Sequence, residues 1–146
     1  MKVTSPNFFE GQPIPTLYTC DGKNINPALV ISDIPIDTVS LAISVDDPDS
    51  PTMDFNHWIV WDILPATLNI PEGWKPNEEV FGVNSFGQSG YGGPCPSVGQ
   101  HRYIFTVFAL DKLVDLPKEA KKFDFDRETK DHIIEVAQLM GVYKRK

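Results

Sequence analysis

The chain has 146 residues, of which 41% are hydrophobic and 23% are charged, and its formal net charge is −7. This length and composition are typical of a globular protein rather than of a disordered chain, so we expect a single domain over residues 1–146. The negative charge disfavours nucleic acid as a partner, because its phosphate backbone would be repelled.

Neither a membrane span nor a signal peptide is recognisable. No stretch reaches the ~18 consecutive apolar residues that a span needs, and the first residues lack the apolar core of a signal peptide. We therefore predict a soluble, cytoplasmic protein without membrane insertion. Its two cysteines, Cys20 and Cys95, are too few for a disulfide scaffold and lack the spacing of a zinc site. In a cytoplasm they would stay reduced, except in a hyperthermophile.

Short apolar runs, separated by 13 prolines and 10 glycines, predict a mainly β protein. In chain order the strand candidates cover residues 3–8, 28–34, 40–45, 57–63 and 102–110. The last two runs are apolar on both faces, so we expect them to lie centrally in a sheet that is covered on both sides. Strict alternation would place Ile63 on the same face as Ile59 and Trp61.

The pattern changes near the C-terminus, where we predict helices. Pro117 suits the start of a short helix over residues 118–122, and a longer helix over 127–140 would begin after Asp126 as its cap. Gly141 would end it. The residues that recur at helical spacing are Ile133, Val136, Ala137 and Met140.

An acidic loop follows the strand over residues 40–45, with the sequence Asp46-Asp47-Pro48-Asp49-Ser50-Pro51. Period-two alternation places Asp47 on the same face as the apolar residues of the strand, so its carboxylate should point inward. The alternative is an acidic turn that only caps backbone amides. A tight turn of this kind also predicts a cis peptide bond between Ser50 and Pro51.

Two histidines stand at the starts of apolar strands. His57 opens one and His101 directly precedes another. Each alone is typical of a core or surface histidine, but with an inward carboxylate they predict a pocket at one end of the sheet. The glycine-rich segment 86–103 could turn backbone N–H groups toward an anion, although a tight structural connection explains it equally well.

These segments together resemble the phosphatidylethanolamine-binding protein family, in its bacterial and archaeal Raf-kinase-inhibitor-like branch. They follow the order of the family and cover nearly the whole chain. The matching motifs are Tyr18–Asn24, Asp47–Pro51, His57-Trp58, Gly90–Pro96, Gly99–Tyr103 and the closing segment 132–145. Two positions depart from the family pattern, Ser97 after Pro96 and Asn26 before Pro27.

The resemblance implies a fold of two antiparallel sheets with a few peripheral helices and a pocket for phosphate-type head groups, as in a phospholipid, a nucleotide or another phosphorylated ligand. It implies no cofactor. The ligand-binding residues would be Asp47, His57, Gly93, Pro94, Cys95, Pro96, His101 and Tyr103. Supporting residues would be Asp49, Trp58 and Arg102, with Asp49 and Arg102 pairing with each other or with backbone. The resemblance also places Cys20 and Cys95 at the same end of the sheet, within disulfide reach.

Other functions stay open beside that of a non-enzymatic binding protein. The Asp and His cluster could serve acid–base catalysis in a hydrolase, with Cys95 or Ser97 as nucleophile. One carboxylate and two histidines could also bind iron as a facial triad. The resemblance further allows an inhibitor of a kinase or protease, and a homodimer is compatible with the sequence.

Overall fold

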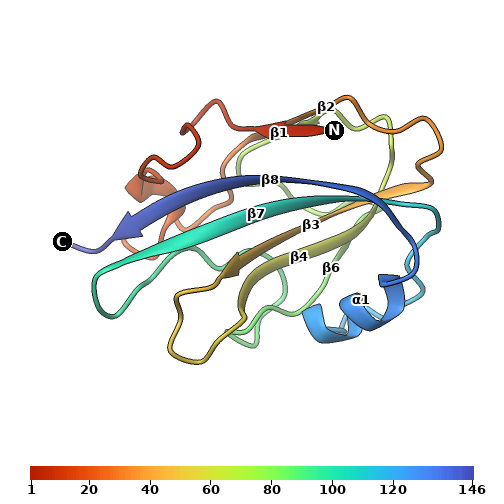
Figure 1. The fold of residues 1–146 in the computed structure, drawn as a ribbon. Helices are drawn as coiled ribbons and strands as arrows, with labels where there is room; N and C mark the ends of the chain where they lie inside the picture. Colours follow the sequence, from red (N-terminus) through yellow and green to blue (C-terminus); the bar gives the residue numbers. More distant parts are fainter.

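Two antiparallel β-sheets form the fold in the computed structural model, which describes all of residues 1–146 (Figure 1). The larger sheet has the strand order β6-β4-β3-β7-β8, and the smaller has the order β1-β2-β5. The larger sheet comprises β3 (Ser40–Asp47), β4 (Phe55–Ile63), β6 (Val80–Phe81), β7 (Gln100–Leu110) and β8 (Ile133–Lys144). The smaller comprises β1 (Lys2–Thr4), β2 (Leu29–Ser32) and β5 (Asn69–Ile70). The mainly β prediction is confirmed, and each predicted strand overlaps one of these.

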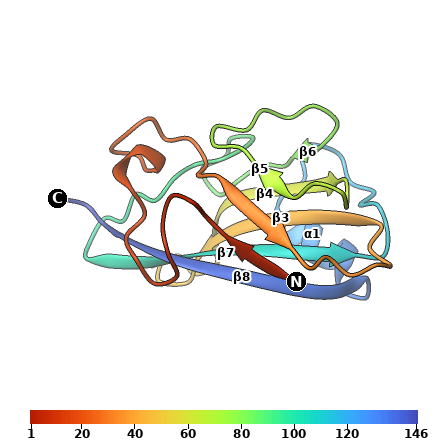
Figure 2. The ribbon, with the colours of Figure 1, turned by 90° about the horizontal axis from the view of Figure 1, so that it is seen from above.

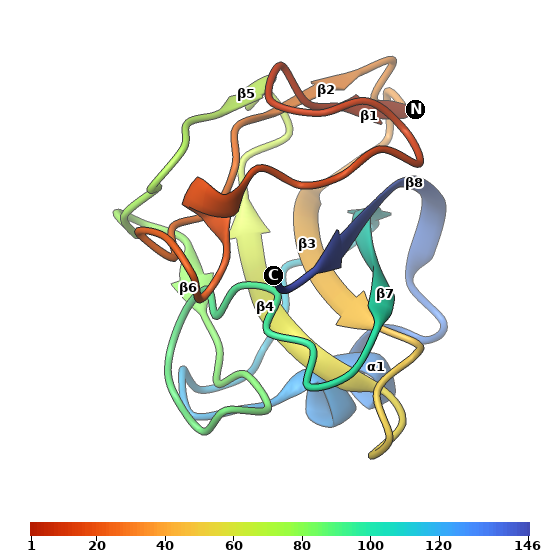
Figure 3. The ribbon, with the colours of Figure 1, turned by 90° about the vertical axis from the view of Figure 1, so that its left-hand side faces the viewer.

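The larger sheet is covered on both faces. The smaller sheet lies over one face, as the top and end-on views show (Figures 2 and 3), and the helix α1 (Lys122–Thr129) lies under the other. Alternate residues of β7, such as Phe105 and Val107, belong to the core between the sheets, whereas Phe108 and Leu110 pack with Phe125 of α1. The apolar pattern on both faces of residues 102–110 therefore correctly indicated a covered, internal strand.

Two irregularities in the pairing of β3 with β4 decide which way β4 side chains point. From Val60 to Ile63 β4 advances by three positions, whereas β3 advances by two, and Asp62 has a φ of 59°. This extra residue moves Ile63 into the core between the sheets, so its predicted position beside Ile59 and Trp61 is wrong. The second irregularity, between Val45 and Asp46, lies opposite His57, at the edge of the pocket described below.

The predicted helix over residues 127–140 is wrong. The helix begins at Lys122 and ends at Thr129, with Lys121 rather than Asp126 at its N-cap, and residues 118 and 119 form only a turn in place of the short helix predicted over 118–122. Residues 133–144 form β8, which pairs with β7 along its whole length. The apolar residues of this segment fit the spacing of a helix and that of a strand. The strand forms because its alternate residues supply the buried side chains, namely Ala137, Leu139 and Tyr143.

Gly141 is required by close packing within β8, not as a helix cap. A Cβ atom at this position would lie 2.5 Å from Cγ1 of Ile14 and 2.8 Å from Cε2 of Phe8. We therefore expect Gly141→Ala to lower the free energy of unfolding by about 1–3 kcal/mol, the usual cost of overpacking. Denaturant unfolding measures this, with the exposed Gln138→Ala on the same strand as control. Equal midpoints for both variants would contradict the close packing.

No helix in this fold combines the length and the apolar character that a membrane crossing needs.

Candidate functional site

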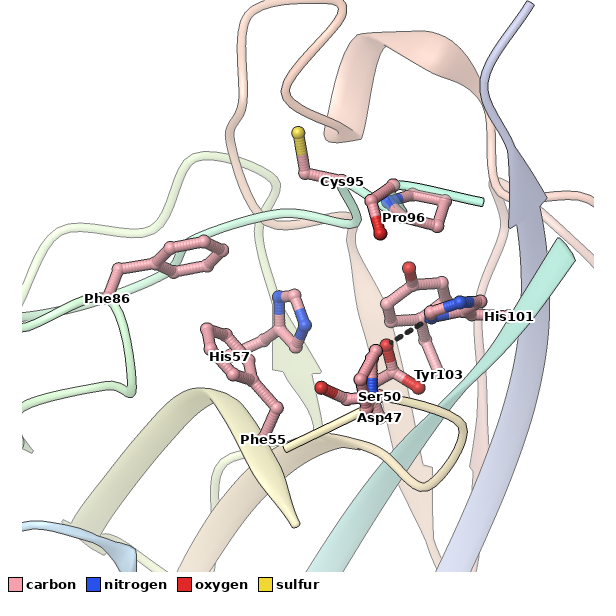
Figure 4. Close-up of a pocket in the computed structure, with 11 residues that line it drawn as sticks. Asp47, Ser50, Phe55, His57, Phe86, Cys95, Pro96, His101 and Tyr103 are labelled. Atoms are coloured by element: carbon pink, nitrogen blue, oxygen red, sulfur yellow. Dashed lines mark hydrogen bonds and ion pairs between the residues drawn. The ribbon is translucent and has the colours of Figure 1, made fainter. Parts of the chain in front are cut away.

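A pocket of about 170 Å³ lies at one end of the larger sheet, where β3 ends and β7 begins (Figure 4). It is lined by Asp47, Ser50, Pro51, Phe55, His57, Phe86, Cys95, Pro96, Ser97, His101 and Tyr103. The antiparallel order of β4, β3 and β7 brings these residues together, because the start of two strands meets the end of the strand between them. The structure thus gathers Asp47, His57 and His101, as the sequence predicted.

Asp47 and His101 form a buried pair. The Oδ2 atom of Asp47 lies 2.7 Å from Nδ1 of His101, and the two residues are 4% and 9% exposed. The other oxygen of the carboxylate accepts the backbone N–H of Asp49 at 2.8 Å. This arrangement fixes the orientation of the imidazole. The Nδ1–H group donates to the carboxylate, and Nε2 is left to contact a ligand. The inward orientation predicted for Asp47 is confirmed.

His57 is held by the glycine-rich segment rather than by a carboxylate. Its Nδ1 lies 2.6 Å from the carbonyl oxygen of Gly92, so this nitrogen carries the proton that it donates. Burial lowers the pKa of His57, although Gly92 and the Asp47 charge act in the opposite direction. His57 therefore contributes a neutral imidazole in the free protein near neutral pH.

The Tyr103 side chain has an unusual polar atom. The residue is fully buried, and its hydroxyl group has no hydrogen-bond partner of standard geometry in the protein. Burial raises the pKa of Tyr103, and the Asp47 charge adds to the shift, while the nearby backbone N–H of Cys95 opposes it. Among the residues that line the pocket, only Tyr103 has such a buried, unpaired group. A buried hydroxyl without a partner is costly, so its presence in a pocket needs a reason.

Asp49 and Arg102 brace the pocket from outside. The carboxylate of Asp49 accepts the backbone N–H of Arg102 at 2.9 Å, and its two oxygens accept the guanidinium at 2.8 and 3.0 Å. These hydrogen bonds lower the pKa of Asp49 to about 2. They fix the loop after β3 next to His101, and the pairing expected for these two residues is confirmed.

The cis bond predicted between Ser50 and Pro51 is wrong, since the chain has no cis peptide bond. The loop reverses by other means. Met53 and Asp54 both have a φ of 51°, and this left-handed conformation supplies the turn for which a cis proline was expected.

One wall of the pocket is tied to the N-terminal part of the chain. Cys95 forms a disulfide with Cys20, with their Cα atoms 5.5 Å apart, so the expected disulfide reach is confirmed. The Cys20 N–H also donates to the Pro94 carbonyl at 3.1 Å, and the Gly93 N–H donates to Oδ1 of Asn24 at 2.7 Å. A side chain at Gly93 would overlap the Tyr18 carbonyl. These contacts hold Cys95 and Pro96 against the pocket.

Three aromatic rings form the opposite wall. Phe55, His57 and Phe86 have ring centroids 4.8 to 5.3 Å apart and are mutually tilted. Figure 4 shows these rings on one side of the pocket and Asp47, His101 and Tyr103 on the other. The pocket therefore has an aromatic side and a polar side.

Some predicted site residues lie behind the pocket instead of lining it. Gly93 and Pro94 support the wall of the pocket through backbone hydrogen bonds. Trp58 is buried against the rings of Trp74, Phe81 and Tyr91.

Sequence reasoning missed four of the lining residues, which are Ser50, Pro51, Phe55 and Phe86, and it considered Ser97 only as a nucleophile. Phe55 stands two residues before His57 on the same strand, so alternation could have found it. Phe86 gave no comparable signal, because it enters the pocket from a loop.

The geometry bears on the two alternative chemistries. Cys95 is part of a disulfide, so it offers no thiolate nucleophile. Asp47 and His101 bond directly to each other, and no group of three or more His, Cys, Asp or Glu side chains is placed to hold a metal ion. The site instead offers hydrogen-bond donors around a small cavity.

Known proteins are similar to this chain both in sequence and in structure. The sequence profile of the phosphatidylethanolamine-binding protein family matches residues 4–144. UPF0098 proteins of Aquifex aeolicus and Methanothermobacter thermautotrophicus are 42% and 39% identical to the chain. Each alignment covers 99% of the chain, with 89% and 99% of the respective relative.

Solved structures agree over the whole fold. The phosphatidylethanolamine-binding protein homologue CT736 of Chlamydia trachomatis superposes with a TM-score of 0.94 at 37% identity, covering 99% of this chain and 97% of that one. YbcL of E. coli, a member of the same family, gives a TM-score of 0.93 at 29% identity, covering 99% and 98%. The sequence similarity and the fold are therefore those of a small binding protein. The chain belongs to the phosphatidylethanolamine-binding protein family.

Proposed function

We propose that the pocket binds the phosphate group of a phosphomonoester, and that the protein acts by binding this ligand rather than by transforming it. The buried, unpaired hydroxyl of Tyr103 carries the proposal. A ligand oxygen would give this group the hydrogen bond that the protein withholds, and the Cys95 N–H beside it could donate to the same anion.

The charges around the cavity fit an anion once the Asp47 and His101 pair is considered as a unit. A carboxylate alone would repel phosphate, but both of its oxygens already accept hydrogen bonds from Asp49 and His101. The carboxylate can therefore stabilise a positive charge on His101, whose Nε2 would then donate to phosphate. His57 is neutral in the free protein, so the empty pocket holds no unpaired buried charge at this residue.

Tyr103→Phe tests the proposal, because a ligand-binding hydroxyl and a structural hydroxyl predict opposite changes in affinity and stability. Loss of a hydrogen bond to a charged ligand should weaken the binding of ethyl phosphate by roughly ten-fold or more. The free protein should be as stable as the wild type or slightly more so, since the substitution removes an unsatisfied buried group.

Isothermal titration calorimetry and thermal unfolding supply the two readouts. Tyr143→Phe is the matched control, because it removes a hydroxyl that already donates to Asp21 at 2.6 Å outside the pocket. It should lower stability and leave affinity unchanged. If Tyr103→Phe instead lowers stability while binding persists, the hydroxyl is structural and the proposal fails.

Hydrolytic turnover is the main alternative, and we expect none. The pocket has an oriented histidine but lacks a thiolate, and neither Ser50 nor Ser97 has a hydrogen bond to His57 or His101 that would activate it. A phosphatase and esterase screen with chromogenic substrates checks this. Activity in the wild type that disappears in His101→Ala would replace binding by catalysis as the function of the site.

A further inference from the structure

The aromatic wall indicates which part of a ligand follows the phosphate. Tyr103 on the polar side is fully buried, whereas Phe86 on the aromatic side is 47% exposed. Tyr103 therefore lies at the deep end of the pocket, and the Phe86 ring lies at its mouth. A phosphate bound at Tyr103 and His101 would direct the rest of the ligand past Phe55 and Phe86 toward solvent.

The Phe86 ring is held in place despite its exposure. Its backbone N–H donates to Oδ1 of Asn84 at 2.9 Å, and the same oxygen accepts the N–H of Gln88 at 3.3 Å, which fixes the turn. The ring lies on the backbone of Gly92, where a Cβ atom would be 2.5 Å from Cδ2 of Phe86. The Gly92 carbonyl in turn holds His57. The wall is thus organised before any ligand arrives.

From this arrangement, and resting on the proposed binding of phosphate, we propose that the ligand is an aryl phosphomonoester, and that Phe86 selects its ring. Tilted aromatic rings accept a further ring by offset or edge contacts, which contribute beyond the burial of apolar area. A saturated ring of the same size would gain only the burial. The cavity of about 170 Å³ has room for one phosphate and one such ring, but it is too small to enclose a ligand with a longer chain.

Three phosphate esters separate these contributions by calorimetry. Ethyl phosphate reports the phosphate site, cyclohexyl phosphate adds apolar area, and phenyl phosphate adds an aromatic ring. We expect wild-type protein to bind phenyl phosphate about three- to ten-fold more tightly than cyclohexyl phosphate. Phe86→Leu should remove most of this preference, measured as the ratio of the two affinities in the same variant. Phe9→Leu, which alters a phenylalanine that is 81% exposed and lies outside the pocket, should change nothing.

The comparison between variants does not depend on how the esters differ in ionisation, because each ratio is taken with the same pair of ligands. If ethyl and phenyl phosphate bind equally, or if Phe86→Leu keeps the preference for the aromatic ring, the aryl inference is overturned while phosphate binding stands. If none of the three esters binds, the proposed function itself is overturned.

Discussion

Replacing both Cys20 and Cys95 by serine is expected to lower the free energy of unfolding by about 4 kcal/mol, because the disulfide closes a long loop. The two residues are 75 positions apart in the sequence, and cross-linking removes the entropy of that loop from the unfolded chain. In the folded protein the neighbouring contacts remain. The Tyr91 hydroxyl still donates to the Tyr18 carbonyl at 2.7 Å, so the fold should survive with reduced stability.

Guanidinium unfolding with and without reductant measures this effect. The wild type should lose the same stability when it is reduced, and the double variant should not respond to reductant. A wild-type protein whose unfolding midpoint is unchanged by full reduction would show that the link is not a determinant of stability.

Asp47→Asn is expected to weaken the binding of ethyl phosphate by roughly ten-fold, equivalent to ~1.4 kcal/mol. The direction of this change separates two roles of the carboxylate. If Asp47 only repelled the anion, neutralising it would improve binding. Because its Oδ2 lies 2.7 Å from Nδ1 of His101, we expect the opposite, since an amide supports the charged imidazole less well than a carboxylate.

Asp49→Asn is the matched control for this experiment. It removes the same charge two residues away, from a carboxylate that pairs with Arg102 and does not line the pocket. Its effect on affinity should be smaller than that of Asp47→Asn, because the contact between Asp47 and His101 stays in place, so a comparison of the two variants separates this contact from the general change in charge. Tighter binding by Asp47→Asn would refute the positioning role.

The sequence identified the site better than the elements around it. Asp47, His57 and His101 were recognisable because polar residues interrupt strong apolar runs at strand ends, and alternation alone gave the inward orientation of Asp47. The family motifs then added Tyr103 and the wall at Cys95 and Pro96. None of these steps required tertiary information.

The errors arose where two local patterns compete. Residues 133–144 contain apolar side chains at spacings that suit a helix as well as a strand, and only the free edge of β7 decides between them. Strict alternation likewise fails at Asp62, where an extra residue changes the face of Ile63. Phe86 was missed because its place in the pocket depends on the packing of its ring against Gly92, a contact that sequence spacing does not predict.

The pH dependence of anion binding in the wild-type protein tests the proposed site most directly. Burial lowers the pKa of His57, so this side chain is neutral in the free protein at neutral pH. An anion in the pocket favours imidazolium, which raises that pKa in the complex, and binding therefore takes up a proton. Affinity should then rise by about three- to ten-fold as the pH falls from about 7.5 to about 6.

The measurement is a calorimetric titration at these two pH values with ethyl phosphate and with inorganic sulfate, whose charge stays constant over this range. We expect tighter binding of both anions at the lower pH, and a smaller difference in His57→Ala. Affinities that do not change with pH, or wild-type and His57→Ala proteins that behave alike, would contradict a phosphate site built on this pocket.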